Sequence, residues 1–375
     1  MGVATDATVG TVRAIALGDP AALGPWRTRW DDVARRSGAL ACQSSAWLTA
    51  WWSVLEPAAE VTLLVHYEPG EGLQAPSGLW ALGAMRRRLH RRVPISLPYV
   101  GVAGAGLGAA DHMGPLSTSA GVGASLLAAA MDVAGDRPLV LSNLASRHHP
   151  AAAGLTGAVL VERTPCPGVD LRSAATTAEL WRPSRRGDIR RCERRMREAG
   201  FERRWVRLGD SNLHELDELQ RLHRRLWTWR GQQGLLDDRR KRFLAAVAAG
   251  LDEPDGAWLQ LIEGSGGPIA AMLALRFGST MCSYATGWDP THRRLGLGVL
   301  LEAGGIELAL AQGLDRYDFL RGTEPHKFAL GGVSDVDSTY CVPRGWAGPL
   351  LLRRDRMAAR RSAAADMVAA GGPPR

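Results

Sequence analysis

The sequence predicts a mixed α/β protein made of two layered domains. The chain has 375 residues, which is long enough for about two domains of ordinary size, each with its own core. Helical and strand patterns alternate along both halves, as in α/β layer folds. With 46% hydrophobic and 22% charged residues, the composition is that of a folded globular protein.

The first half begins with a predicted helix and continues with strands. In Ser45–Leu55, Trp47, Trp51 and Leu55 recur at helical spacing, which favours a core-facing helix. Short apolar runs bounded by turn residues predict strands, and one small-residue run predicts a second helix. The strands are expected at Val61–His66, Gly78–Met85, Val93–Tyr99 and Pro138–Leu144, and the helix at Ala124–Ala134.

A domain boundary is predicted within residues 162–175, where ERTPCPGVDLRSAA combines two prolines with polar residues. We therefore divide the chain into an N-terminal domain (1–170), a C-terminal domain (171–348) and a C-terminal helix with a tail (349–375). In the second domain we expect helices at Pro183–Ala199, Asn212–Arg230 and Arg239–Ala249, and strands at Trp258–Glu263, Ile269–Phe277, Met281–Trp288 and Tyr317–Leu320.

The net charge of +8 is concentrated in one region. Residues 181–242 hold 19 Arg and Lys and 10 Asp and Glu, a local net of +9. Within the predicted helix Pro183–Ala199, the helical spacing puts four arginines on one face: Arg186, Arg190, Arg194 and Arg197. Such a face suits a polyanion such as coenzyme phosphates or tRNA, although a solvated arginine-rich helix fits equally well.

The sequence predicts a cytoplasmic protein without a membrane span or a metal site. The first 19 residues lack the basic start and apolar stretch of a signal peptide, and no apolar run reaches the roughly 18 residues of a span. The five cysteines are odd in number and show no C-x-x-C spacing, and His148-His149 has no further ligands at metal spacing.

A strand, a glycine-rich turn and a helix follow one another at Met281–Trp288, Arg293-x-x-Gly296-x-Gly298 and Val299 onward. Glycines let a backbone approach a ligand closely, and the first N–H groups of a helix have no partners inside it. A pyrophosphate suits that arrangement. We call the segment predicted to bind the pyrophosphate the cradle. It comprises Arg293, Arg294, Leu295, Gly296, Leu297, Gly298 and Val299.

This motif resembles the coenzyme A pyrophosphate loop of GNAT acyltransferases, Gln/Arg-x-x-Gly-x-Gly/Ala. The segments Trp181–Gly200, Trp258–Trp288 and Tyr317–Lys327 resemble the cellulose-biosynthesis (CelD/BcsL) type of that superfamily, which is related to the Fem-type aminoacyltransferases. With Ser45–Trp52, the similarity spans roughly residues 40–345. It implies tandem GNAT-like domains, each with a mixed, mostly antiparallel central sheet flanked by helices, and an acceptor between the halves.

Lys327 stands where many GNAT enzymes have the tyrosine of Tyr-x-x-x-Gly-Phe, a general acid, in the register Lys327-Phe328-Ala329-Leu330-Gly331-Gly332. Only Lys241 and Lys327 among the 46 basic residues are lysines, so this position has retained a lysine where arginine is the rule. An ammonium here would stabilise an oxyanion, protonate the leaving group or hold a donor phosphate. The alternative is a surface salt bridge.

Two carboxylates are candidates for the base that takes the proton of the acceptor amine, Glu324 and Asp318. Glu324 is alternatively an ion-pair partner of Lys327 or Arg321, and Asp318 a helix cap or a buried structural pair. Five further residues are expected to contact substrate: Trp288, Tyr284, Arg321, Asp111 and His112.

Three functions are compatible with these features. The first is an N-acyltransferase that moves an acyl group from acyl-CoA to a small-molecule amine. The second is an aminoacyl-tRNA-dependent aminoacyltransferase in natural-product or cell-envelope biosynthesis, with tRNA bound through the basic region 181–242. The third is a non-catalytic binding module of GNAT fold, which intact Gly296, Gly298 and Lys327 disfavour.

Overall fold

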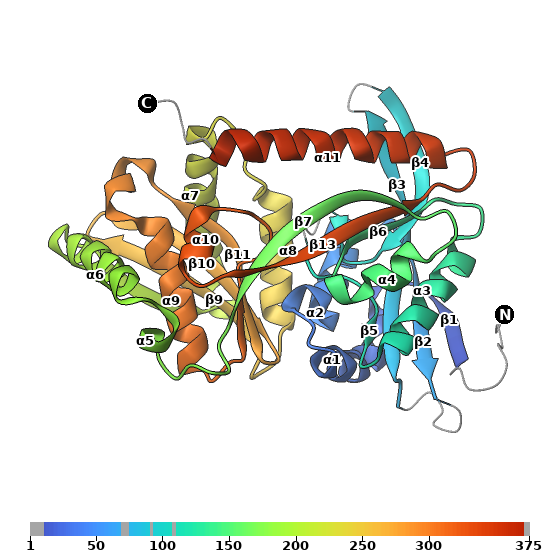
Figure 1. Cartoon of the computed structure of the whole chain (residues 1–375), viewed down its shortest axis with the longest axis horizontal. Helices are drawn as coiled ribbons and strands as arrows, with labels where there is room; N and C mark the ends of the chain where they lie inside the picture. Colours follow the sequence, from blue (N-terminus) through green and yellow to red (C-terminus); the bar gives the residue numbers. More distant parts are fainter. Residues whose placement is uncertain (1–10, 69–74, 91–92, 107–109, 371–375) are drawn as a thin grey trace. The chain divides into compact units, whose positions relative to one another are not determined.

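The computed structural model describes residues 11–68, 75–90, 93–106 and 110–370, and the chain divides into two compact units (Figure 1). The first unit contains residues 1–164 and 336–375, and the second contains residues 165–335. The chain enters the second unit within β7 (Val159–Asp170) and returns within β13 (Val333–Val342). The predicted division at residue 170 remains a prediction about independently folding domains.

The first unit is a sheet with the strand order β1-β2-β3-β4-β6-β13, and the short β5 pairs with β3. Neighbouring strands of this sheet are antiparallel, except β4 and β6, which are parallel to each other. The strands are β1 (Thr11–Leu17), β2 (Glu60–Tyr67), β3 (Gly78–His90), β4 (Val93–Val102), β5 (Leu116–Ser117) and β6 (Leu139–Leu144). The helices are α1 (Arg27–Arg36), α2 (Ser45–Ala50), α3 (Ala120–Ala134), α4 (His149–Ala153) and α11 (Gly348–Ala370), with short turns η1 (Pro20–Trp26), η2 (Ala41–Gln43), η3 (Trp51–Leu55) and η6 (Ser146–His148).

The second unit has the strand order β7-β12-β11-β10-β9-β8, in which only the pair β11 and β12 is parallel. The strands are β8 (Glu202–Arg207), β9 (Gly256–Gly264), β10 (Gly267–Phe277), β11 (Thr280–Trp288) and β12 (Arg316–Asp318). The helices are α5 (Thr177–Leu180), α6 (Pro183–Glu198), α7 (Leu216–Trp229), α8 (Asp238–Gly250), α9 (Leu297–Ala311) and α10 (Pro325–Ala329), with turns η7 (Asp210–Glu215) and η8 (Pro290–Leu295).

Both units use the same order of elements. Three antiparallel strands are followed by a helix and by a strand parallel to the third: β2, β3, β4, α3 and β6 in the first unit, and β9, β10, β11, α9 and β12 in the second. A parallel pair needs a crossover connection, which α3 and α9 provide. The two halves are therefore copies of one mixed, mostly antiparallel layer fold, as predicted.

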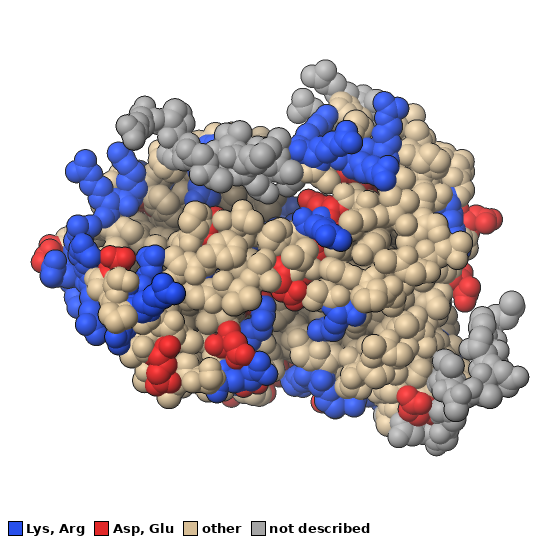
Figure 2. Space-filling model, in the orientation of Figure 1, with Lys and Arg blue, Asp and Glu red and all other residues tan. Residues whose placement is uncertain are grey.

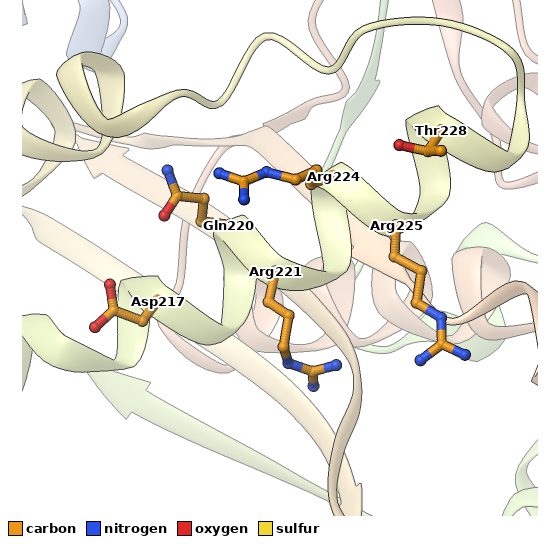
Figure 3. A pocket seen from close by; sticks show the side chains of 6 residues that line it. All are labelled: Asp217, Gln220, Arg221, Arg224, Arg225 and Thr228. Carbon is orange, nitrogen blue, oxygen red and sulfur yellow. The ribbon is translucent and has the colours of Figure 1, made fainter.

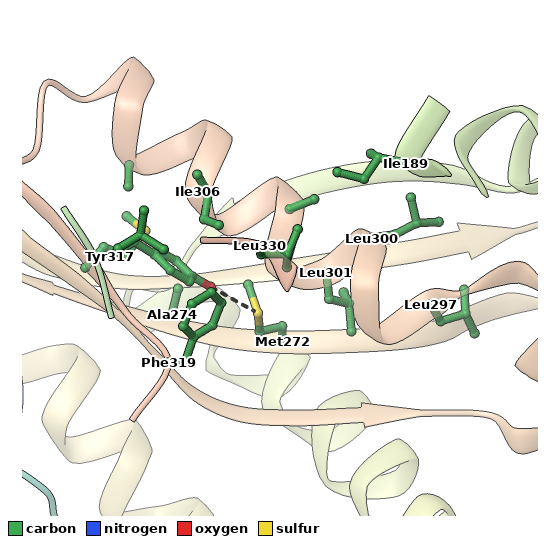
Figure 4. Packing of buried hydrophobic residues seen from close by; sticks show 14 of the residues in the cluster. Ile189, Met272, Ala274, Leu297, Leu300, Leu301, Ile306, Tyr317, Phe319 and Leu330 are labelled. Carbon is green, nitrogen blue, oxygen red and sulfur yellow. Dashed lines mark hydrogen bonds between the residues drawn. The ribbon is translucent and has the colours of Figure 1, made fainter. Parts of the chain in front are cut away.

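In the second unit, α9 and α7 cover opposite faces of the sheet. Met272 and Ala274 of β10 belong to one core cluster with Leu297, Leu301 and Ile306 of α9 (Figure 4). Gly287 of β11, which pairs with Ala271, the residue directly before Met272, contacts the backbone of α7 instead. Because side chains alternate across a strand, the two helices lie on different sides. α9 is apolar on nearly every side, and it is correspondingly buried.

The structure refines several predicted elements. The helix predicted at Ser45–Leu55 is α-helical only to Ala50 and continues as a π-helical turn. The strand predicted to reach Leu320 ends at Asp318, because Leu320 has a left-handed backbone with φ 54°. The two prolines near the predicted boundary lie in β7, where the carbonyls of Pro165 and Pro167 accept hydrogen bonds from the N–H groups of Gly322 and Phe319. Among the described residues, the helices are too short or too polar to cross a bilayer.

Candidate active site

The parallel strands β11 and β12 separate in the middle of the second unit. They pair only over Thr280–Cys282 and Arg316–Asp318, after which β11 continues to Trp288 without this neighbour. We call this place the fork. One arm is Ser283–Trp288, and the other is the segment Phe319–Glu324. The N-terminus of α9 follows the first arm, and α10 follows the second.

A β-bulge lies at the start of the first arm. Opposite β10, Ala274 pairs with Ser283 and Leu273 pairs with Ala285, so Tyr284 is the extra residue. A bulge bends its strand and redirects the neighbouring groups, and bulges are frequent beside active sites. Tyr284, predicted to contact substrate, therefore lies at the point where the strands separate.

The N-terminus of α9 offers uncapped backbone donors at the end of the fork. Its N-cap is Gly296, with φ 72° and no side chain to cap the helix, so the first N–H groups of the helix lack intrahelical partners. A Cβ on Gly298 would have its nearest neighbour at 3.8 Å, Nε1 of Trp288, so the space beside this residue is open. The equivalent α3 differs, because the hydroxyl of Ser119 accepts a hydrogen bond from the N–H of Val122 at 3.2 Å.

Side chains from several elements hold the turn that leads into α9. Asp289 accepts hydrogen bonds from the N–H of Thr291 (3.0 Å) and its hydroxyl (2.8 Å), and pairs with Arg225 of α7 at 2.8 Å. Burial alone would raise the pKa of Asp289, but the bonds from Thr291 and the charge of Arg225 lower it below its ordinary value. On the other side, a Cβ on Gly296 would lie 2.8 Å from the sulfur of Cys192 in α6. The turn is thus fixed between two helices.

Within the predicted cradle the side chains differ in their surroundings. Arg293 and Arg294 are exposed, and within the described residues neither side chain makes an ion pair or hydrogen bond. Leu297 is buried in the core, and Leu295 and Val299 pack against it. Only the two arginine side chains and the backbone of Gly296–Val299 are therefore suited to contact an anion.

Lys327 is buried beside the second arm of the fork, with 5% of its surface exposed. Its Nζ donates to the carbonyl of Arg321 at 2.6 Å and, more weakly, to that of Leu320 at 3.5 Å, and it pairs with Glu324 at 3.1 Å. The left-handed backbone of Leu320 and Gly322 (φ 54° and 124°) curls this arm around the ammonium. Lys327 is thus not a surface salt bridge, and its protons face acceptors of the arm.

The two predicted bases lie in different environments. Glu324 has a side chain that is 47% exposed. Burial raises its pKa, but Lys327, a backbone hydrogen bond and His326 together lower it below its ordinary value. Asp318 is fully buried, accepts two hydrogen bonds from Arg316 (2.9 and 2.7 Å) and accepts the N–H of Leu320 at 2.8 Å. These contacts favour the structural alternative for Asp318. Glu324 makes the ion pair with Lys327 that was its alternative, and it is also the more accessible of the two carboxylates.

Sequence reasoning missed Glu302, in the middle of α9. It is 4% exposed, and its carboxylate accepts hydrogen bonds from the hydroxyls of Ser283 (3.0 Å) and Tyr317 (2.8 Å). Burial raises the pKa of Glu302, against the lowering effects of Tyr317, Lys327 and Ser283. The available signal was an acid that interrupts the apolar start of α9 and is followed, after one alanine, by Gly304 and Gly305.

Two further residues near the fork were also missed, His326 and Arg230. Burial lowers the pKa of His326, on α10 beside Lys327, which favours a neutral imidazole. Arg230 follows α7, and its guanidinium lies over the ring of Trp227 at 5.2 Å. The neighbouring Trp229 approaches Trp288, with ring centroids 6.1 Å apart. Trp288, a predicted substrate contact, therefore belongs to an aromatic pair beside Gly298.

Of the remaining predicted residues, Arg321 belongs to the fork, whereas Asp111 and His112 lie apart from it in the chain. Asp111 and His112 are buried in the first unit, where Nδ1 of His112 is 3.0 Å from Asp337. Arg321 is an exposed residue of the second arm, whose carbonyl receives Lys327. Their predicted contacts with substrate stay predictions.

The arginines predicted to bind a polyanion lie on α6, where Figure 2 shows basic side chains gathered at the left. Arg190 is exposed, whereas Arg194 and Arg197 pair with acids of the same helix at 3.6 and 3.9 Å. A second basic surface lies along α7 as a groove of about 380 Å³ (Figure 3). It is lined by Asp217, Gln220, Arg221, Arg224, Arg225 and Thr228.

Comparisons with known proteins agree with this architecture. The model of the acetyltransferase (GNAT) domain matches residues 183–328, which include α6, the fork, the turn before α9 and Lys327. A search of curated protein sequences gave no match. The chain therefore has a GNAT acetyltransferase fold in its second unit.

Among solved structures, FemX is similar with a TM-score of 0.58 and 10% identity, over 88% of this chain and 97% of that one. The C-terminal domain of a putative lysylphosphatidylglycerol synthetase from Agrobacterium fabrum has a TM-score of 0.56 and 10% identity (89% and 96% covered). L-PGS from Bacillus licheniformis has a TM-score of 0.54 and 11% identity (89% and 96% covered). At these identities the likeness concerns the fold, and it extends over both units.

Proposed function

We propose that this chain is an N-acyltransferase that takes an acyl group from acyl-CoA and transfers it to an amine. The observation that carries the proposal is the uncapped, glycine-lined N-terminus of α9 at the end of a fork between parallel strands. We further propose that the chain is of the cellulose-biosynthesis (CelD/BcsL) type, because the resemblance of its C-terminal motifs falls on the elements that form the fork.

The pyrophosphate of the donor would bind the backbone N–H groups at Leu297–Val299. Helix N-termini favour anions through these donors and through the helix dipole. Arg293 and Arg294 add positive charge at the solvent side, and the open space beside Gly298 lets a phosphate approach the backbone. The acyl end would extend along the first arm toward the bulge at Tyr284.

The reaction forms an amide bond and breaks the thioester bond of the donor. The amine nitrogen attacks the acyl carbon, the thiolate leaves, and the amine loses one proton while the thiolate gains one. Glu324 is the accessible carboxylate, and His326 is a neighbouring imidazole whose lowered pKa favours the neutral, proton-accepting form. Lys327 would supply positive charge near the developing oxyanion and fix the second arm in place.

An aminoacyl-tRNA donor is the second candidate, because the exposed arginines of α6 lie on the helix that contacts the turn before α9. The structural likeness to FemX and L-PGS is compatible with it. A phosphate cradle serves a coenzyme or a tRNA 3′ end equally well. Binding of tRNA through this surface should weaken steeply with salt, since it releases counterions.

Incubation of the purified protein with a panel of acyl-CoAs and, separately, charged tRNAs tests both candidates. Mass spectrometry would follow release of free coenzyme A or deacylated tRNA, and transfer to a mixture of small amines. We expect acyl-CoA turnover that Glu324→Gln reduces and that Glu218→Gln, a partly buried glutamate of α7 that pairs with Arg221, does not. Turnover of charged tRNA alone would replace the first candidate by the second. Turnover of neither donor would leave the chain as a binding module.

A further inference from the structure

A carboxylate lies inside the apolar core of the second unit, at Glu302 of α9. Its neighbours along the helix include Leu300, Leu301 and Ile306, all at or below 1% exposed. A buried carboxylate is costly, whereas an apolar side chain of similar size would suit this core. The presence of Glu302 therefore needs a reason other than stability.

The hydrogen bonds of Glu302 connect α9 to both strands of the fork. One carboxylate oxygen accepts from Ser283 at 3.0 Å, and the other accepts from Tyr317 at 2.8 Å. Ser283 directly precedes the bulged Tyr284, and Tyr317 is the middle residue of β12, where it pairs with Met281. One side chain thus fixes the last paired region of both strands relative to the helix that begins with the donor turn.

The two glycines after Glu302 make this contact sterically possible. A Cβ on Gly305 would lie 2.2 Å from the hydroxyl of Tyr317, and one on Gly304 would lie 2.0 Å from the amide nitrogen of Gln260. Glycine destabilises a helix interior relative to alanine, so two adjacent glycines indicate that close approach to the sheet outweighs helix stability here. The close approach brings Tyr317 within reach of the carboxylate.

The charges around Glu302 agree with its role as an acceptor. Burial and the nearby carboxylate raise the pKa of Tyr317 well above its ordinary value, so its hydroxyl keeps the proton that it donates. Lys327, beside the second arm, is close enough to lower the pKa of Glu302, which burial raises. The carboxylate therefore also interacts with the one lysine of the fork.

We infer that Glu302 is a positioning residue that sets the geometry of the fork through Ser283 and Tyr317. It holds the bulge at Tyr284 and the end of β12 in the arrangement that receives the acyl end of the donor. The inference rests on the proposed function for the identity of that ligand, but its structural content concerns only the two strands and α9. Glu302 acts through its neighbours and does not touch substrate.

Removing the whole network separates positioning from stability. We choose the triple variant Glu302→Leu, Ser283→Ala, Tyr317→Phe, because replacing all partners of a buried polar network by apolar groups is often neutral or stabilising. The matched control is Glu307→Gln on the same helix, where Glu307 pairs with Arg203 at 2.7 Å near the surface. Chemical unfolding, titration with acetyl-CoA and fluorine NMR of protein labelled with 3-fluorotyrosine are measured on each variant.

Among the five tyrosines of the chain, Tyr284 serves as a direct reporter of the fork. Tyr284 is the bulged residue, whereas Tyr67, Tyr99 and Tyr340 belong to the first unit. The triple variant should unfold at a denaturant concentration no lower than the wild type, bind acetyl-CoA at least about tenfold more weakly and shift the Tyr284 resonance. Unchanged affinity together with an unchanged Tyr284 resonance would overturn the inference.

A wrong donor identity and a wrong role for Glu302 give different experimental results. If the wild type does not bind acetyl-CoA, the proposed donor is wrong, and the Tyr284 resonance alone decides whether Glu302 positions the fork. If the triple variant does not fold, Glu302→Gln takes its place, since it keeps the shape of the side chain and removes the charge and one acceptor. The same two readouts then apply, with a shifted Tyr284 resonance as support and unchanged readouts as refutation.

Discussion

The two lysines of the chain have opposite surroundings. Lys327 is buried with its ammonium directed at the carbonyls of Arg321 and Leu320, whereas Lys241 has a side chain that is 29% exposed and pairs with Asp217. An arginine would not fit within the second arm at this position, because its planar guanidinium is larger than an ammonium and holds its N–H donors in a rigid plane. The retention of lysine at this position therefore has a steric reason in addition to any chemical one.

Lys327→Met should destabilise the protein, because it leaves buried carbonyls without a donor while keeping the length of the side chain. We expect a loss of about 1–3 kcal/mol in the free energy of unfolding, measured by chemical denaturation. Lys241→Met is the control and should cost no more than about 1 kcal/mol, as expected for an exposed pair. Equal effects of the two substitutions would contradict the described burial of Lys327.

His148 is a second residue with a testable electrostatic environment. It is 4% exposed, and its ring fills the space beside Gly114, where a Cβ would lie 2.4 Å from the ring. Burial, helped by Arg147 and His149, lowers its pKa from 6.5 to about 3, so the folded protein holds it neutral at acidic pH where the unfolded chain protonates it. The contribution of neutral His148 to the free energy of unfolding is therefore complete above pH 6.5 and is lost as the pH falls toward 3.

The pH dependence of the free energy of unfolding should reveal the lowered pKa of His148. Between pH 7 and pH 5 the wild type should lose about 2 kcal/mol of unfolding free energy relative to His148→Gln. Denaturant unfolding of both proteins at several pH values measures the difference. Parallel pH profiles for the two would show that His148 protonates as readily in the folded state as in the unfolded one.

At the scale of elements, α9 combines the turn that we propose for donor binding with the buried carboxylate of Glu302. Its start was predictable, because Arg293-x-x-Gly296-x-Gly298 after a strand is a local pattern with a known consequence for backbone shape. Glu302 was not predictable in the same way. A glutamate in a helix usually points to solvent, and only the register of β11 and β12 brings two hydroxyls to Glu302.

Gly305→Ala should be destabilising even though alanine favours helices. Its Cβ would lie 2.2 Å from the hydroxyl of Tyr317, and the resulting overpacking should cost about 1–3 kcal/mol of unfolding free energy. Gly187→Ala in α6 is the matched control, because Gly187 is exposed and has nothing within 4 Å of the Cβ position. Thermal or chemical unfolding should show that the control is stabilised by about 0.5–1 kcal/mol. A stabilised Gly305→Ala would contradict the close packing of α9 on β12.

At the scale of the whole molecule, two copies of one layer fold have different helix N-termini. The mixed α/β class and most strands were predictable, because apolar runs and turn residues are local signals. The return of residues 336–375 to the first unit was not, since β13 pairs with β6 about 200 residues earlier and local pattern carries no information on such pairing. The relation of Lys327 to the second arm likewise depends on the left-handed backbone of Leu320, which a non-glycine residue rarely adopts.

The different N-caps of α3 and α9 lead to the central proposal, that α9 and not α3 binds the donor. Gly298 and Gly121 occupy the same position, the second residue of each helix. Neither has a close neighbour at the Cβ position, so glutamate at either site should leave the fold intact. At α9 the added carboxylate would occupy and repel the phosphate cradle, whereas at α3 it would face solvent.

Titration calorimetry with coenzyme A on the wild type, Gly298→Glu and Gly121→Glu tests this claim most directly. We predict binding to the wild type and to Gly121→Glu with equal affinity, and a loss of at least about a hundredfold in Gly298→Glu. Equal affinity of all three proteins, or a loss confined to Gly121→Glu, would contradict a donor site at the N-terminus of α9.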